Sequence, residues 1–193
     1  TSFTAYQEFQ SMLTRDRIDI FMVGEFDDYQ VLQALHRFPL EGRQVDLQFS
    51  YSQPYVNVVK EKIEPRQSSQ SILQLGYQFP CQYGDKDYFA LIVFNAMFGE
   101  FAHSALFTTL REKEGLAYSI SSQFDIFTGL LEVYAGIEKS NRNQAMRGIS
   151  RELNYIKLGR FSSSLLNQTK KIIRMNALLS EDHALTLVEQ RFN

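Results

Sequence analysis

The sequence predicts an α+β fold in which a mostly antiparallel sheet is covered by helices. Three observations carry this prediction: a strand-like alternation near the middle of the chain, two β-rich runs joined by a short turn, and apolar stripes at helical spacing before and after them. Short turns join antiparallel strands, and helices with one apolar stripe cover a sheet face. The chain has 193 residues, 44% of them hydrophobic, and is expected to form a single domain, 1–193, with a sizeable core.

The first third of the sequence indicates helices and strands in alternation. A lead-in helix is expected over residues 4–13. Residues 18–24 form a continuous apolar run that ends in glycine, which is typical of a strand buried on both faces. Asp27 begins a capping-box pattern and predicts the start of a second helix. Residues 45–49 alternate between apolar and polar side chains, which indicates a half-buried strand, with a loop edge as the alternative. Residues 56–60 indicate another strand.

The middle of the chain continues with a strand and two helices. Residues 73–79 alternate between apolar and polar side chains, which predicts a strand with one face against helices and the other in polar surroundings. Asp85 opens a helix that is apolar nearly all round, so we expect it to be buried centrally and to end at Gly99. Ser104 is the expected N-cap of a short helix, and Gly115 is its left-handed exit.

The last third predicts a hairpin followed by helices. Residues 118–127 and 130–138 are β-rich and flank a Thr-Gly pair, which is typical of a hairpin turn. Ser140 is expected to cap a helix that Gly159 ends. Apolar residues at helical spacing predict further helices within residues 165–188. The simplest interpretation of their apolar stripe is that it packs in the core, and the alternative is that it forms an interface with a partner.

Composition excludes several classes of function. The net charge is −2 and no Lys/Arg cluster stands out, so the chain has no electrostatic footprint for nucleic acid or an anionic membrane. Cys81 is the only cysteine and allows neither an internal disulfide nor a thiolate metal site. We expect a cytoplasmic location, because this cysteine usage fits a reducing compartment and no apolar run reaches the length of a membrane span. Thr1 in place of an initiator Met suggests a fragment of a longer chain.

Two hydrogen-bond donors stand out in residues 110–119. Arg111 lies on the last turn of the expected short helix, and Tyr118 lies on the strand after its glycine exit. Together they can present hydrogen-bond donors to an oxygen such as a peptide carbonyl. A structural interpretation stands beside this one. An Arg near a helix C-terminus meets the helix dipole favourably, and a Tyr early in a strand packs on the sheet.

Residues 99–119 resemble the second-half domain of the pitrilysin/insulinase/mitochondrial processing peptidase family of zinc peptidases. The resemblance lies in Gly-Glu-Phe-Ala-His-Ser-Ala-Leu-Phe and in Leu-Arg-Glu-Lys-Glu-Gly-Leu-Ala-Tyr-Ser. It implies a metallopeptidase-like, processing-peptidase-like layer of helices on a sheet. It also places Arg111 and Tyr118 where the family's Arg and Tyr hydrogen-bond the substrate backbone, with Ser104 and Gly115 positioning them. Residues 17–27 are similar to the opening of such domains.

The zinc-binding motif of that family is missing from this chain. The family's inverted His-x-x-Glu-His helix holds the metal through two histidines at one-turn spacing. His36, His103 and His183 are far apart in sequence and lack such partners, so we expect no metal site here and no peptide hydrolysis by this chain alone. Zinc is expected, if at all, in a partner half. Three carboxylates have no acid, base or metal partner at a suitable spacing and are expected to face solvent: Glu112, Glu114 and Glu132.

The resemblance therefore implies a non-catalytic, substrate-clamping domain. It would close the chamber over a peptide that is bound to a zinc-bearing N-terminal half or a paralogous subunit, and donate hydrogen bonds to the peptide backbone. A bacterial pair of such proteins, one with the zinc motif and one degenerate, is the expected setting. A catalytically dead scaffold subunit that holds an active zinc peptidase is the first alternative. A stand-alone peptide-binding module that uses an exposed sheet edge is the second.

Overall fold

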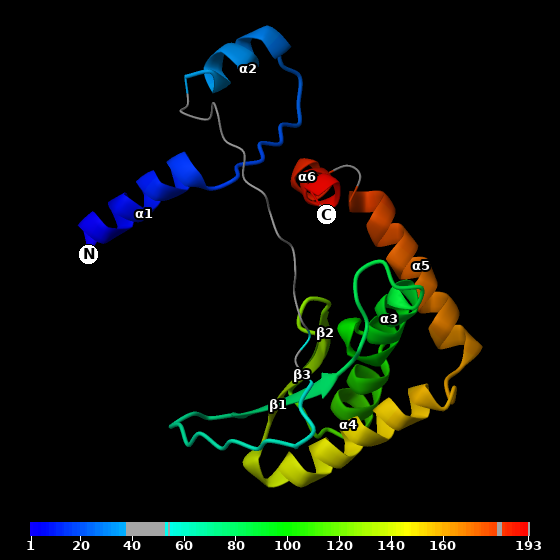
Figure 1. Ribbon diagram of the computed structural model, residues 1–193. Coiled ribbons are helices and arrows are strands. Elements are labelled where there is room, and N and C mark those ends of the chain that lie inside the picture. Colours follow the sequence, from blue (N-terminus) through cyan, green and yellow to red (C-terminus); the bar gives the residue numbers. More distant parts are fainter. Residues whose placement is uncertain (38–52, 54, 181–182, 193) are drawn as a thin grey trace. The chain divides into compact units, whose positions relative to one another are not determined.

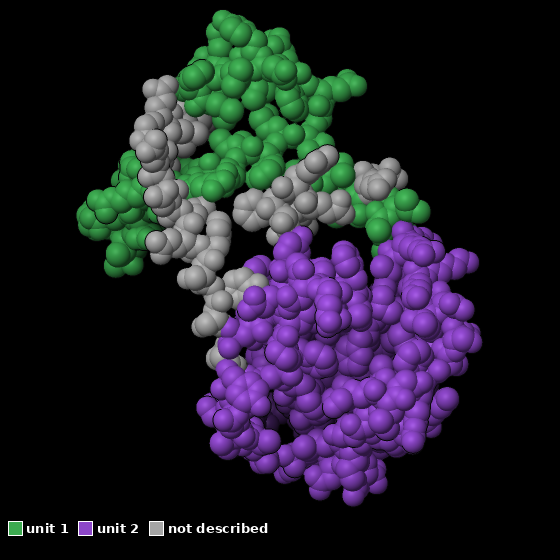
Figure 2. Space-filling view, turned by 45° about the vertical axis from the view of Figure 1, so that its right-hand side comes forward, with its two compact units in different colours: residues 1–50, 176–193 green, residues 51–175 purple. Residues whose placement is uncertain are grey.

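The structure is a computed structural model that describes residues 1–37, 53, 55–180 and 183–192 (Figure 1). The chain divides into two compact units, one of residues 1–50 and 176–193 and the other of residues 51–175, coloured separately in Figure 2. The expected single domain over 1–193 stays a prediction. The strand expected at residues 45–49 lies outside the described residues.

The smaller unit contains helices whose starts follow the sequence signals. Its elements are α1 (Ser2–Arg15), α2 (Asp28–Leu35), the last residues of α5 (Ser163–Ser180) and α6 (Ala184–Phe192). The carboxylate Oδ1 of Asp27 accepts the backbone N–H groups of Tyr29 at 2.9 Å and Gln30 at 3.3 Å. The N-cap expected at Asp27 is confirmed, because this carboxylate satisfies N–H groups that have no partner inside the first turn.

The strand predicted over residues 18–24 is wrong. This segment forms no strand in the described part of the chain, and Phe21 and Met22 expose 41% and 47% of their surface. The same holds for residues 56–60, which form no strand and include Val59 at 96% exposed. An apolar run predicts burial, but a strand also needs a neighbour for its backbone N–H and C=O groups, and no ladder with a described residue forms in either segment.

The larger unit is built on a three-stranded antiparallel sheet in the order β1-β3-β2. Its strands are β1 (Ser71–Gln78), β2 (Ser119–Asp125) and β3 (Leu130–Ile137). Gly129 has φ +66°, and its N–H donates to the carbonyl of Asp125 at 2.9 Å, which closes the β2–β3 turn. The α+β class, the antiparallel sheet and the hairpin are therefore confirmed.

Helices cover one face of this sheet and form the core with it. They are α3 (Tyr88–Asn95), which continues as the π-helical η1 (Ala96–Glu100), the π-helical η2 (Phe107–Lys113), and α4 (Arg142–Lys157), which follows the 3₁₀ turn η3 (Lys139–Asn141). Figure 1 shows α4 running beneath the strands. The core includes Leu73, Phe98, Leu106, Leu110, Ile120, Leu131, Val133, Ala135, Ile137, Ala145, Ile149, Leu153 and Ile156.

Three local predictions differ from the structure. The helix expected at Asp85 begins at Tyr88, because the carboxylate of Asp85 accepts the N–H of Gln82 at 2.8 Å in a separate turn. This helix is not buried all round, since Phe89 is 75% exposed. Ser140 does not cap α4; its hydroxyl donates to Glu138, and the 3₁₀ turn intervenes. No helix among the described residues is long and apolar enough to cross a membrane.

Candidate functional site

The short helix that carries the resemblance begins and ends as the sequence predicts. The hydroxyl Oγ of Ser104, which is fully buried, accepts the N–H of Phe107 at 3.4 Å. At the other end Gly115 has φ +62°, and the N–H of Leu116 donates to the carbonyl of Leu110 at 2.8 Å across this turn. A side chain is strained at such a φ, so glycine is the residue that this exit favours.

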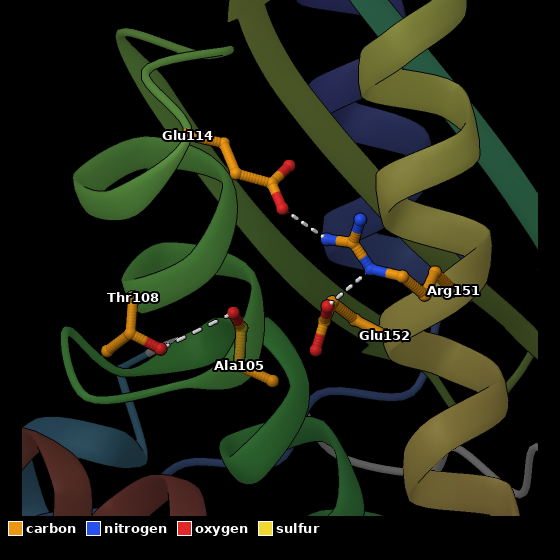
Figure 3. A network of polar contacts seen from close by, with 5 residues as sticks. All are labelled: Ala105, Thr108, Glu114, Arg151 and Glu152. Atoms are coloured by element: carbon orange, nitrogen blue, oxygen red, sulfur yellow. Dashed lines mark hydrogen bonds and ion pairs between the residues drawn. The ribbon is translucent and has the colours of Figure 1, made fainter.

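The backbone hydrogen bonds inside this helix join residues that are further apart in sequence than in an α-helix. The N–H of Glu114 donates to the carbonyl of Thr109 at 2.9 Å, and residues 107–113 are π-helical as η2. At the start of the segment, the hydroxyl of Thr108 donates to the carbonyl of Ser104 at 2.8 Å. It also donates, more weakly, to the carbonyl of Ala105 at 3.4 Å (Figure 3). Short π-helical segments occur frequently at functional sites. No residue pattern distinguishes them, so the sequence gives no signal for this one.

Arg111 projects from η2, and its guanidinium packs against an aromatic ring. Its guanidinium carbon lies 4.5 Å from the centroid of the Phe107 ring, one turn earlier, and the side chain is exposed. Within the described part of the chain it forms no hydrogen bond and no ion pair. The ring holds the guanidinium plane by a cation–π contact, and its N–H groups remain available to an external acceptor.

Tyr118 is engaged with a carboxylate. Its N–H donates to the carbonyl of Gly136 at 2.8 Å, and its half-exposed hydroxyl donates to Oε1 of Glu138 at 2.7 Å. This hydrogen bond raises the pKa of the Tyr118 phenol above its usual value near 10. To donate to a peptide carbonyl, the phenol must release Glu138. Among the described residues no hydrogen bond or ring contact joins Tyr118 to Arg111, so their action on one oxygen stays a prediction.

An ion-pair network ties the end of η2 to α4 (Figure 3). Nη2 of Arg151 lies 2.7 Å from Oε1 of Glu114, and its Nε lies 3.0 Å from Oε1 of Glu152. Glu152 is buried, with 8% of its surface exposed. The hydrogen bond from Arg151 to Glu152, and to a smaller extent the one to Glu114, raises the pKa of Arg151. Glu114 is exposed as expected, but α4 supplies it with a cation 37 positions away in sequence, which local spacing does not reveal. This network holds the residue before the Gly115 turn.

A groove on this unit runs along α4 and includes Arg151, the partner of Glu114. Its volume is about 550 Å³. All of its lining residues belong to α4 or follow it directly: Met146, Arg147, Ser150, Arg151, Asn154, Tyr155 and Leu158. A depression along one helix lacks the opposing wall that small-molecule sites have. We assign it no role.

The histidines do not form a metal site in the described residues. Nε2 of His103 lies 2.9 Å from the hydroxyl of the fully buried Thr169, and its ring stacks on Phe101 at 5.5 Å between centroids. Burial lowers the pKa of His103 below its usual value near 6.5. No group of three or more His, Cys, Asp or Glu side chains that could hold a metal occurs among the described residues. These residues do not fit the zinc of the active family members, and no chemical step is assigned to a metal here.

The chain resembles curated proteins of which it spans less than half. It is 38% identical over 185 residues to the "Probable inactive metalloprotease YmfF" of Bacillus subtilis (strain 168), covering 95% of this chain and 43% of that protein. It is 26% identical over 172 residues to the "Uncharacterized zinc protease YmxG" of the same organism, covering 86% of this chain and 41% of that protein.

Solved structures share the fold. A conserved protein from Enterococcus faecalis V583 matches with a TM-score of 0.88 and 40% identity over 99% of this chain and 45% of that chain. A Helicobacter pylori protease at 19% identity matches over 86% of this chain and 42% of that chain with a TM-score of 0.66, which shows the fold alone. The model of the Peptidase M16 inactive domain family matches residues 6–173. The chain therefore belongs to the Peptidase M16 inactive domain family, which confirms the resemblance carried by residues 99–119.

Proposed function

We propose that this chain is the non-catalytic, peptide-clamping half of a larger metallopeptidase-like protein. The observation that carries the proposal is Arg111, whose guanidinium is exposed, held over Phe107 and without a polar partner among the described residues. A preorganised donor on a surface supports recognition of an external oxygen, because its side chain need not break an internal ion pair first. The inactive-domain family supports a non-catalytic role.

In this proposal the zinc-bearing partner, either an N-terminal half or a paralogous subunit, holds an extended peptide. Arg111 donates to a backbone carbonyl of that peptide. Tyr118 joins only when its hydroxyl exchanges Glu138 for the peptide, so it acts as the second and weaker donor. Ser104, Gly115 and the Glu114–Arg151 pair position the helix end that carries these donors.

The test is Arg111→Ala in the full-length protein assembled with its zinc-bearing half. We expect peptide turnover to fall about 10- to 100-fold, the loss that follows removal of a charge-assisted hydrogen bond. The matched control is Lys113→Ala, which removes an exposed cation from the same helix. Circular dichroism must show both variants folded. Equal turnover by wild type and a folded Arg111→Ala variant would contradict the clamp.

A catalytically dead scaffold is the second candidate, favoured by the word "inactive" in the name of the 38% identical relative. Zinc content of the full-length protein, measured by elemental analysis after dialysis against a weak chelator, separates the two. About one zinc per chain is what a single catalytic site requires and favours the clamp of an active peptidase. Zinc far below that ratio favours a scaffold, with the metal in a partner subunit.

A further inference from the structure

The two hydrogen-bond donors of the proposed clamp are in different states. Arg111 is held over Phe107 and forms no hydrogen bond or ion pair within the described residues. The phenol of Tyr118 donates its only hydroxyl proton to Oε1 of Glu138 at 2.7 Å. Because a phenol has a single donor, Tyr118 cannot donate to Glu138 and to a peptide carbonyl at the same time. The clamp therefore has one available donor and one occupied donor.

The backbones of Tyr118 and Glu138 are both fixed at the end of the sheet. The N–H of Tyr118 donates to the carbonyl of Gly136 in β3 at 2.8 Å. Glu138 follows β3 directly, and its carbonyl accepts the N–H of Asn141 at 2.9 Å where η3 begins. The β2–β3 pair thus brings the phenol and the carboxylate together before any peptide binds.

Glu138 competes strongly for the phenol because no cation among the described residues pairs with it. Its other carboxylate oxygen accepts from the hydroxyl of Ser140 at 3.5 Å, which is long for a hydrogen bond. A charged acceptor holds a hydroxyl more strongly than a neutral carbonyl does. A peptide carbonyl can therefore displace Glu138 from Tyr118 only at a cost in binding free energy.

A second carboxylate of this sheet provides a contrast. The expectation that Glu132 faces solvent is wrong in part, because it is half-buried. It accepts hydrogen bonds from three neutral donors: the amides of Gln74 at 3.3 Å and Gln123 at 3.0 Å and the phenol of Tyr134 at 3.3 Å. Three donors share that carboxylate, whereas the short bond from Tyr118 is the principal one that Glu138 accepts. The Tyr118–Glu138 contact is therefore the closer of the two tyrosine–carboxylate pairs.

We propose that Glu138 regulates the clamp by competing with the peptide for the Tyr118 phenol, and thereby lowers the affinity of the clamp. The inference rests on the proposed peptide clamp and adds a residue whose removal should tighten binding. Glu138 is a positioning residue, because it acts through Tyr118. A clamp with one available donor holds its peptide less tightly and releases it sooner.

The test measures, by anisotropy, how tightly the full-length protein containing this chain binds a fluorescently labelled peptide without charged side chains. We expect Glu138→Gln and Glu138→Ala to bind it about two- to fivefold more tightly than wild type, the range of one exposed hydrogen bond. The tightening should vanish when Tyr118→Phe is added, because phenylalanine has no hydroxyl. The matched control Glu112→Gln removes an exposed carboxylate next to Arg111 and should leave the affinity unchanged. Circular dichroism must show every variant folded.

The outcomes separate this competition from the clamp itself. Tyr118→Phe alone should change the wild-type affinity less than about twofold, since its hydroxyl is already occupied. A loss as large as that of Arg111→Ala would mean that Tyr118 already donates to the peptide, which overturns the competition and leaves the clamp standing. Unchanged affinity in both Glu138 variants, or a tightening that persists with Tyr118→Phe, overturns it in the same way. Equal binding by wild type and Arg111→Ala contradicts the clamp, and the competition with it.

Discussion

At Gly99 a close contact, and not an unusual backbone angle, demands glycine. A Cβ there would lie 2.6 Å from Oγ of Ser122 and 2.8 Å from its backbone nitrogen. That hydroxyl donates to the buried Asn95 amide oxygen at 2.7 Å, so Ser122 cannot rotate away without breaking a buried hydrogen bond. The contact sets how closely η1 approaches β2.

We expect Gly99→Ala to destabilise the protein by about 1–3 kcal/mol, because the added methyl overpacks a rigid contact. Urea denaturation of the wild type and the variant measures the free energy of unfolding. Gly76→Ala is the matched control, since its Cβ would have no atom within 4 Å and its stability should stay close to that of the wild type. Equal stabilities of the two variants would show that the approach of η1 to β2 tolerates a methyl group.

At the scale of the element, the ends of η2 could be predicted and its interior could not. Ser104 and Gly115 are local signals, because a cap hydroxyl and a left-handed glycine act on neighbouring backbone groups. The π-helical hydrogen bonds have no such signal. The same limit applies to Glu114, whose partner Arg151 comes from a different helix. Tyr118 is recognisable as a donor from the sequence, but its acceptor Glu138 lies 20 positions away.

The ion-pair network of Arg151 predicts that replacing this arginine lowers the stability of the protein more than replacing another arginine of α4. Arg151→Ala leaves the buried Glu152 carboxylate without its cation and frees Glu114 at the end of η2. We expect a loss of about 1–2 kcal/mol in the free energy of unfolding, a value reduced because Arg151 is partly exposed. Arg147→Ala on the same helix, exposed and without a polar partner among the described residues, should cost less than about 0.5 kcal/mol. Equal losses of stability in the two variants would mean that the effect comes from helix propensity and not from the ion pairs.

For the molecule as a whole, alternation and turn chemistry predict the sheet of the larger unit, and the motif predicts its family. The strand Ser71–Gln78 and the β2–β3 hairpin follow from local pattern, because each has one face in the core. The apolar runs at residues 18–24 and 56–60 lead to wrong predictions, since hydrophobicity alone does not supply a strand partner. The hydrogen-bond network of Glu132 joins side chains from all three strands, and only the strand register brings Glu132, Gln74 and Gln123 together.

His103 links distant parts of the larger unit and makes its stability depend on pH. Its hydrogen bond to Thr169 joins the turn before η2 to α5, 66 positions away. Burial lowers the pKa of His103 in the folded state, so the neutral ring is favoured there. The stability from this effect is complete above the unfolded pKa near 6.5 and is lost as pH falls through the lower folded pKa. We expect the free energy of unfolding in urea to drop between about pH 7.5 and pH 5. The drop should be smaller in His103→Gln, which cannot titrate. An identical pH dependence in both proteins would mean that protonating His103 costs the fold nothing.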